Sequence, residues 1–264
     1  MDTFPAIGKT SGLIATDGAL AHALAARLAA AKQRVLVYMT AGAPRISAMP
    51  GVEAAATPTD IAFECETVLS CVDDSLLFRD LLIGTKERMG FGAEMAPGAT
   101  LIDLGVRPPR ETQALLGVIG QRGVALIDAA LIGPLSGLAH GGVTVLAGGF
   151  PDAVDTAAPL LGLFGRLERT GPLGSAHTSA ALMGYIEAAH AVAHDEAVSV
   201  GRALGLSAET LADVLVCPAT SADNIIRLGR RTALIRALAA ERGVAADVVD
   251  FIGARLERTA AESR

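Results

Sequence analysis

The first part of the chain alternates compact apolar runs with longer segments of helical periodicity. Ser11–Ala15 is a short apolar run, Ala19–Ala31 is rich in alanine, and Arg34–Tyr38 is a β-branched run typical of a buried strand. A strand, a turn, a helix and a second strand within about 30 residues predict a βαβ unit, whose right-handed crossover makes both strands parallel.

The same alternation continues along the chain. Further strands are predicted at Thr67–Val72, Thr100–Leu104, Val124–Asp128 and Gly142–Ala147. Further helices are predicted at Leu76–Ile83, Pro108–Arg122 and Pro151–Leu163. Strands that alternate with helices favour a doubly wound parallel α/β sheet of the Rossmann type, here over residues 1–168.

The pattern changes at Gly171–Gly174, which reads GPLG and predicts a linker. After it we expect no strand, but one long helix at about residues 175–204 that ends at Gly205. Shorter helices are predicted at Ala208–Val216, Ser221–Leu228, Thr232–Arg242 and from Ala246 to the C-terminus. These segments predict a smaller all-α domain at residues 169–264. Because its long helix is too apolar to stand exposed, we expect a homodimer through this domain.

Composition narrows the class of protein. Hydrophobic residues make up 51% of the chain and charged residues 19%, which predicts a large buried core and excludes a disordered protein. The net charge of -6 gives no basic surface, so we expect no nucleic-acid partner. Cys65, Cys71 and Cys217 form no metal-like cluster and are typical of reduced thiols in a cytoplasmic protein. We see no secretory signal and no apolar run of about 18 residues, so we expect no membrane span.

Several segments carry motifs in a fixed order along the chain. They are Val68–Asp74, Pro97–Asp103, Asp128–Gly149, Gly171–Gly174 and Gly205–Ser207. Together with the change from α/β to all-α, they resemble the β-hydroxyacid dehydrogenases, the family of 3-hydroxyisobutyrate dehydrogenase and, more distantly, 6-phosphogluconate dehydrogenase and the imine reductases. The resemblance implies an NAD(P)-dependent oxidoreductase with a small-molecule substrate.

The first strand-to-helix turn is the expected place for a dinucleotide. Such a turn usually reads G-x-G-x-x-G, which leaves bare backbone beside the pyrophosphate. Here Ala15 or Thr16 stands at the first glycine, while Gly18 and Ala21 serve as the second and third. Asp17 would repel a pyrophosphate unless its carboxylate points away or caps the helix. The alternative is an ordinary turn whose cofactor role has decayed.

Two further regions should contact the cofactor. The second strand ends without an acidic residue for the ribose, whereas Thr40 and Arg45 suit a 2′-phosphate, which favours NADP over NAD. Arg45 is alternatively a solvated loop residue. The resemblance also places Val72 and Asp73, and then Gly105 and Val106, beside the cofactor. Relatives carry a hydroxyl residue at the latter turn, and Gly105 would still allow close approach of the nicotinamide ring.

The substrate side departs from the family. Ile132 and Gly133 stand in the turn where relatives have Ser-Gly, and isoleucine cannot hold a substrate carboxylate or hydroxyl. The resemblance places the family's catalytic lysine at Ala180 and its asparagine at Gly184. All three lysines, Lys9, Lys32 and Lys86, lie in the first domain, so the usual proton donor is missing. A less polar substrate is therefore expected.

Other residues are candidates to replace the lysine. His177 and Glu187 share a helix face with Ala180, and His177 has a suitable intrinsic pKa. The alternative for His177 is a structural histidine at a helix start. Arg230 stands where relatives have a lysine that reaches the cofactor, or it belongs to an ordinary basic pair.

A metal site is the other interpretation of this helix. Glu187, His190 and His194 form a stripe along one helix, but no second helix offers further ligands, so we expect no metal. Three functions stay open from the sequence. The first is an NAD(P)-dependent oxidoreductase with a divergent site. The second is a non-catalytic member that binds a nucleotide or metabolite, and the third is a non-redox lyase or isomerase that uses His177.

Overall fold

The computed structural model describes residues 10–40, 49–215, 222–243 and 247–262. The chain divides into two compact units, residues 1–179 and 180–264, which are described separately. Arg45 and Cys217, named above, lie outside the described residues.

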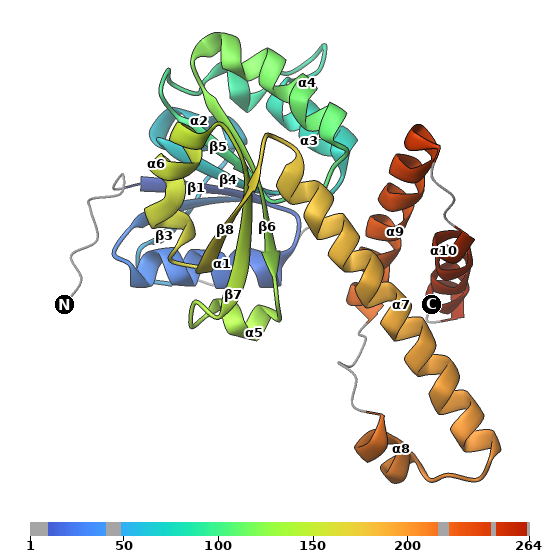
Figure 1. Cartoon of the computed structure of the whole chain (residues 1–264). Coiled ribbons are helices and arrows are strands. Elements are labelled where there is room, and N and C mark those ends of the chain that lie inside the picture. Colours follow the sequence, from blue (N-terminus) through green and yellow to red (C-terminus); the bar gives the residue numbers. More distant parts are fainter. Residues whose placement is uncertain (1–9, 41–48, 216–221, 244–246, 263–264) are drawn as a thin grey trace. The chain divides into compact units, whose positions relative to one another are not determined.

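The first unit is built on one sheet of eight strands in the order β3-β2-β1-β4-β5-β6-β7-β8 (Figure 1). The strands are β1 (Thr10–Ala15), β2 (Arg34–Met39), β3 (Val52–Ala54), β4 (Thr67–Cys71), β5 (Thr100–Asp103), β6 (Ala125–Ile132), β7 (Val143–Gly149) and β8 (Gly165–Gly171). Neighbouring strands pair in parallel except β6 and β7, which are antiparallel. The strand order reverses at β1, because β2 and β3 lie on one side of it and β4 and the later strands on the other, as in a doubly wound sheet.

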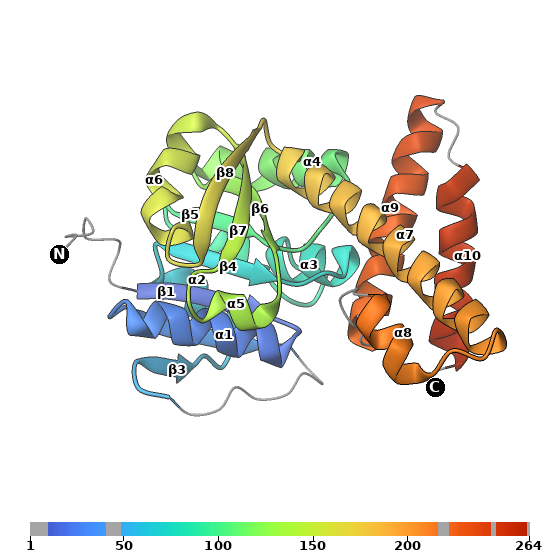
Figure 2. The ribbon, with the colours of Figure 1, turned by 60° about the horizontal axis from the view of Figure 1, so that its bottom comes forward.

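Helices cover both faces of this sheet (Figure 2). One face carries α1 (Gly18–Ala30), α5 (Leu135–Leu138) and α6 (Pro151–Leu161). The other carries α2 (Pro58–Glu64), α3 (Ser75–Leu82) and α4 (Pro109–Ile119). Two 3₁₀ turns, η1 (Phe91–Ala93) and η2 (Gly120–Arg122), complete the connections. The Rossmann-type α/β fold expected from the sequence is confirmed.

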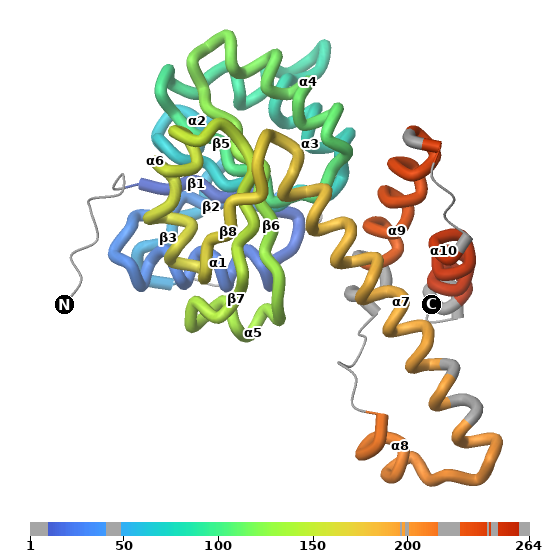
Figure 3. The backbone as a smooth tube through the Cα atoms, in the orientation of Figure 1, coloured from blue at the N-terminus to red at the C-terminus, as the bar shows by residue number. Residues whose placement is uncertain are grey.

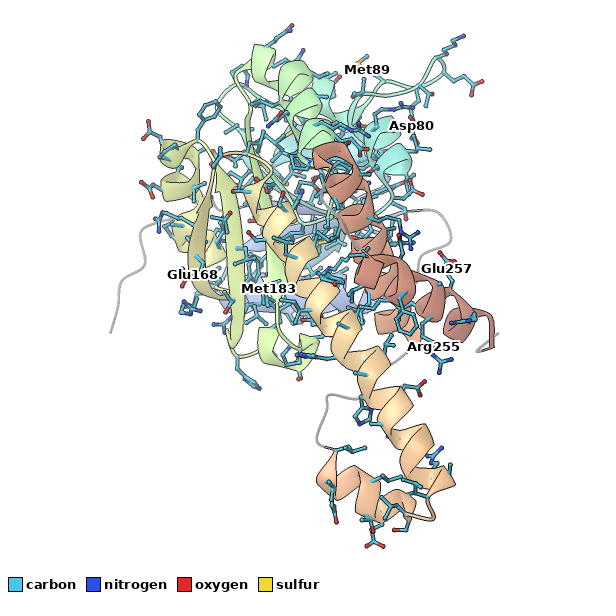
Figure 4. The ribbon with its side chains drawn as sticks, turned by 45° about the vertical axis from the view of Figure 1, so that its right-hand side comes forward. Asp80, Met89, Glu168, Met183, Arg255 and Glu257 are labelled. Carbon is cyan, nitrogen blue, oxygen red and sulfur yellow. The ribbon has the colours of Figure 1, made fainter. Side chains whose placement is uncertain are left out.

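Several details of the expected sheet were wrong. The antiparallel pairing of β7 was not expected, and β3, β8, α2 and α5 were not predicted. β3 and β8 are the edge strands, and edge strands depend on their neighbour more than on their own apolar pattern. In β8, which reads GRLERTG, Leu167 is the one large apolar side chain, and Arg166 and Glu168 form an ion pair. Glu168 is labelled in Figure 4. A strand with so little apolar content is stabilised by its pairing with β7.

The second unit contains helices alone among the residues described there. They are α7 (Ser175–Ala203), which begins in the first unit, α8 (Ala208–Val214), α9 (Ala222–Arg242) and α10 (Asp247–Glu262) (Figure 3). The two helices expected at Ser221–Leu228 and Thr232–Arg242 form one continuous α9, because Gly229 is tolerated inside a helix. Arg255 of α10 donates to Asp195 of α7 at 2.7 Å.

Helix α7 keeps an apolar stripe at the surface. Leu182, Met183 and Ile186 are 49%, 39% and 53% exposed. Met183 is labelled in Figure 4. Of the helices that the structure describes, none combines the length and apolar character needed to cross a membrane.

Candidate functional site

The candidate site lies at the carboxyl edge of the sheet, where β1, β4 and β5 end and β6 continues to Ile132. Ligands of doubly wound proteins bind at this edge, at the point where the strand order reverses. Each of these strands is followed by, or contains, a carboxylate. They are Asp17, Asp73 and Asp74, Asp103, and Asp128. The edge is therefore acidic, and the partner of each carboxylate determines what it can bind.

The first turn is closed by hydrogen bonds within the protein. Oδ1 of Asp17 accepts from the backbone amides of Ala19 and Leu20 at 2.8 and 3.1 Å, so this carboxylate caps α1. The amide and the hydroxyl of Thr16 both donate to the carbonyl of Cys71, at 3.3 and 3.2 Å. The amides that hold a pyrophosphate in a dinucleotide-binding turn are the same groups. In this turn they already have partners.

The small residues of the turn lie where β1 meets α1. Gly18 is the first residue of α1, and Ala15 and Ala21 are buried between strand and helix. The amide of Thr40 donates to the carbonyl of Ala15 at 3.0 Å, and Thr40 is 7% exposed. The backbone shape of the turn therefore fits a dinucleotide, whereas its occupied amide donors do not.

A buried ion pair lies at the ends of β4 and β5, and sequence analysis missed it. Nε and Nη2 of Arg107 donate to the two carboxylate oxygens of Asp103 at 2.5 and 3.0 Å. The guanidinium also donates to the carbonyl of Val72 and lies 4.0 Å from the ring centre of Phe78. Both charged side chains are at most 1% exposed. The only sequence signal is their i, i+4 spacing just after a strand.

Gly105 lies beside both the carbonyl of Val72 and the guanidinium of Arg107. A Cβ at Gly105 would lie 2.4 Å from the carbonyl oxygen of Val72 and 2.5 Å from Nη2 of Arg107. Glycine at this position therefore leaves space for the guanidinium of Arg107. From the sequence we had expected this space to admit the nicotinamide ring. Val106 is half-buried and Asp73 is exposed.

Asp128 holds the start of α7. Its two oxygens accept from the amides of Gly174 and His177 at 2.7 and 2.9 Å, and Asp128 is fully buried. A carboxylate at a helix N-terminus is stabilised by the free amides and the helix dipole. This contact fixes the first turn of α7 to the middle of β6.

The ring of His177 is enclosed by the same cluster. Its Nε2 lies 3.0 Å from the carbonyl oxygen of Asp103, and its Nδ1 lies 3.4 Å from the hydroxyl of Thr112. His177 is 0% exposed. Because a carbonyl only accepts, Nε2 carries a proton and donates it. Both ring nitrogens are thus engaged within the protein.

Cys71, at the end of β4, lies close enough to the carboxylates of this edge for them to affect the pKa of its thiol. Burial raises the pKa of the Cys71 thiol well above its ordinary value, and the carboxylates of Asp73, Asp103 and Asp17 raise it further. Burial likewise raises the pKa of Cys65 to about 12. Both thiols are therefore neutral and unreactive at physiological pH.

The expected substrate turn follows β6. Ile132 is the last residue of β6 and pairs with Thr144 of β7, and Gly133 adopts a positive φ of 131° before Pro134 starts α5. Glycine is favoured at this turn because few other residues adopt that conformation.

In the second unit, the residues expected near the substrate have different neighbours. Ala180 is fully buried and Glu187 is exposed. The side chain of Arg231 crosses α7 at Gly184, where a Cβ would lie 2.2 Å from Cδ of Arg231. Arg230, which sequence analysis had chosen, is exposed. His194 of the considered metal stripe has Nε2 3.1 Å from the carbonyl oxygen of Leu215.

Comparison with known proteins identifies the family. A family model described as the NAD binding domain of 6-phosphogluconate dehydrogenase matches residues 18–179. This chain belongs to that family. The NAD-dependent L-serine dehydrogenase of Pseudomonas aeruginosa is 27% identical over 62% of this chain and 55% of its own length. The L-threonate dehydrogenase of Cupriavidus necator is 26% identical over 61% of this chain and 54% of its own length. The chain thus spans about half the length of these curated relatives.

Solved structures extend the likeness of this NAD-binding family member to nearly the whole chain. The 3-hydroxyisobutyrate dehydrogenase of Salmonella typhimurium has a TM-score of 0.80 at 16% identity and covers 96% of this chain and 94% of its own. That of Mycobacterium tuberculosis, solved with L-serine, has a TM-score of 0.78 at 17% identity, covering 97% and 94%. At these identities the likeness shows the fold. The family match begins at Gly18, directly after Asp17.

Proposed function

We propose that this chain is an NAD(P)-dependent oxidoreductase of the β-hydroxyacid dehydrogenase type, with a substrate less polar than a small hydroxy acid. One observation carries the proposal: the family match over residues 18–179 begins at the first residue of α1 and covers the doubly wound sheet from β2 to β8. In this proposal residues 1–168 form the dinucleotide-binding domain and residues 169–264 form a smaller all-α domain. When bound, the nicotinamide would supply hydride chemistry.

The proposed substrate class follows from the residues that replace polar ones. Ile132, Val106 and Ala180 carry no group that hydrogen-bonds a substrate through its side chain. At these positions the resemblance implies groups that bind a substrate or move its proton, and the apolar side chains here offer no such hydrogen bond. One relative is an L-serine dehydrogenase and another an L-threonate dehydrogenase. We expect this chain to prefer larger, less charged alcohols or imines over both compounds.

The role proposed for His177 is to position the site. Its ring is bonded to Asp103 and Thr112, and its amide is bonded to Asp128. The histidine thereby joins β5, β6, α4 and α7. For the same reason we do not favour a lyase or isomerase that uses this ring as its acid or base, since an exposed proton is needed for that chemistry.

Cofactor titration tests the proposed function. The purified full chain is titrated with NADPH and NADH, followed by nicotinamide fluorescence and by the shift in melting temperature. Saturable binding supports the proposal, and tighter binding of NADPH supports the preference suggested by Thr40 and Arg45. Turnover is then measured with apolar alcohols and imines beside L-serine. Absence of binding for both cofactors would overturn the proposal.

A second function is favoured by one observation. The second unit contains no lysine, because all three lysines lie in the first. A non-catalytic member that binds a nucleotide or metabolite needs no proton donor. Saturable cofactor binding without turnover of any tested substrate would favour this second function.

We also propose a cytoplasmic homodimer formed through the C-terminal helices. Support comes from the exposed apolar stripe of α7, Leu182, Met183 and Ile186. Contiguous apolar side chains at a surface favour association with a partner. Light scattering on the eluting protein tests this, and a monomer at micromolar concentration would contradict it. Replacing Ile186 by Glu should convert the dimer to a monomer.

A further inference from the structure

We propose that Asp17 is a built-in competitor for the dinucleotide pyrophosphate and sets the affinity of the first turn. This inference rests on the proposed function and deepens it. In the state described here, the carboxylate of Asp17 occupies the amides that a phosphate would use. A dinucleotide binds only by displacing that carboxylate or by accepting its repulsion.

The geometry of the turn carries the first part of the argument. A pyrophosphate is bound through backbone amides at the start of the helix. The amides of Ala19 and Leu20 donate to Asp17, and the amide of Thr16 donates to Cys71. A ligand that takes these donors must break the existing bonds first. The net gain on binding is correspondingly smaller, because one set of hydrogen bonds replaces another.

Charge carries the second part. Asp17 is exposed and lies at the carboxyl edge of the sheet, which also carries the exposed Asp73. Arg107 does not neutralise Asp17, because its guanidinium is bonded to Asp103 and Val72. A dianionic pyrophosphate within a few ångströms of an additional carboxylate is repelled.

Two substitutions separate charge from hydrogen bonding. Asp17→Asn keeps an N-cap side chain and removes the charge, whereas Asp17→Gly removes both the charge and the competing acceptor. We expect the affinity for ADP-ribose to rise about tenfold in Asp17→Asn and further in Asp17→Gly. ADP-ribose contains the pyrophosphate and lacks the nicotinamide, so it reports on this half of the cofactor.

Asp74→Asn is the matched control. Asp74 caps α3 as Asp17 caps α1, with Oδ1 accepting from Leu76 and Leu77 at 2.9 Å each. Its substitution removes the same charge from the same sheet edge and leaves the first turn intact. We expect the affinity for ADP-ribose to change less than about twofold in this variant. Adenosine, which carries no phosphate, should bind all four proteins equally.

The experiment is calorimetric titration of wild type and the three variants with ADP-ribose, adenosine, NADH and NADPH, after circular dichroism has shown that each variant folds. Tighter binding in both Asp17 variants and not in Asp74→Asn supports the inference. Equal affinity of wild type and Asp17→Gly overturns it and leaves the proposed function standing. If Asp17→Gly binds ADP-ribose and the wild type binds none of the ligands, the result supports the inference and contradicts the proposed function. Absence of binding in every protein overturns both.

Discussion

Asp103 and Asp128 occupy paired positions on the neighbouring parallel strands β5 and β6, and both carboxylates are fully buried. Two buried negative charges on adjacent strands would destabilise the sheet without compensation. Asp103 is compensated by the guanidinium of Arg107, and Asp128 by the amides at the start of α7. His177 connects the two, because its ring is bonded to the carbonyl of Asp103 and its amide to Asp128.

Substitution of Arg107 by Ala should lower the free energy of unfolding of the first unit by about 3–5 kcal/mol, because it leaves the buried carboxylate of Asp103 without its partner. Urea denaturation followed by circular dichroism measures the change. The control is Arg169→Ala, which breaks an exposed ion pair with Asp155 and should change that free energy by less than about 1 kcal/mol. Similar losses in the two variants would contradict a dominant role for the buried pair.

Two glycines of the first unit should respond to alanine in opposite directions. Gly105→Ala should destabilise by about 1–3 kcal/mol, since its Cβ would meet the carbonyl oxygen of Val72 at 2.4 Å. Gly117 lies in α4 with open space around its Cα, so Gly117→Ala should stabilise by about 0.5–1 kcal/mol. The melting temperatures of the two variants measure both effects. A neutral Gly105→Ala would show that Arg107 has room to move.

His177→Ala should destabilise the protein by about 1–3 kcal/mol, because buried groups at Asp103 and Thr112 lose their partner. If the protein turns over a substrate, this variant should lower kcat/KM and leave the shape of its pH profile unchanged, as expected of a positioning residue. His190→Ala, on the exposed side of α7, is the control and should leave both stability and turnover as in wild type. Loss of one limb of the pH profile in His177→Ala alone would assign the ring a proton-transfer role.

The buried thiols predict a loss of stability in alkali. Burial raises the folded-state pKa of Cys65 to about 12 and of Cys71 well above the ordinary 9.0, so unfolding favours release of their protons. Their contribution to stability is complete below about pH 9 and declines as the pH rises from there toward the folded-state pKa values. Urea unfolding at increasing pH measures the decline, which should weaken in Cys65→Ala/Cys71→Ala.

Thiol modification tests the same burial independently. In Cys217→Ser protein at about pH 8, a thiol-specific reagent should react only after urea is added, because the neutral buried thiol is a poor nucleophile. Rapid labelling of Cys65 or Cys71 in the folded protein would contradict the raised pKa values.

Much of the fold could be predicted because it depends on local pattern. Buried parallel strands such as Arg34–Tyr38 are continuous apolar runs, and the helices between them have apolar faces that repeat along the chain. The edge strand β8 was missed because it reads GRLERTG and has almost no apolar pattern of its own. It is a strand because it pairs with β7, which the local sequence does not reveal. The family resemblance also predicted which turns lie at the carboxyl edge of the sheet.

The sequence by itself determined the doubly wound sheet, the helical second half, and the absence of lysine where relatives are expected to have one. Only the tertiary structure decided which groups at the sheet edge are already bonded. In the folded chain Asp17 caps α1, and Arg107 donates to Asp103 and to the carbonyl of Val72. The side chain that packs against Gly184 is that of Arg231, not Arg230. The reason is that hydrophobic periodicity is a local property, whereas the partner of a polar side chain depends on which segments the folded chain brings within hydrogen-bond distance.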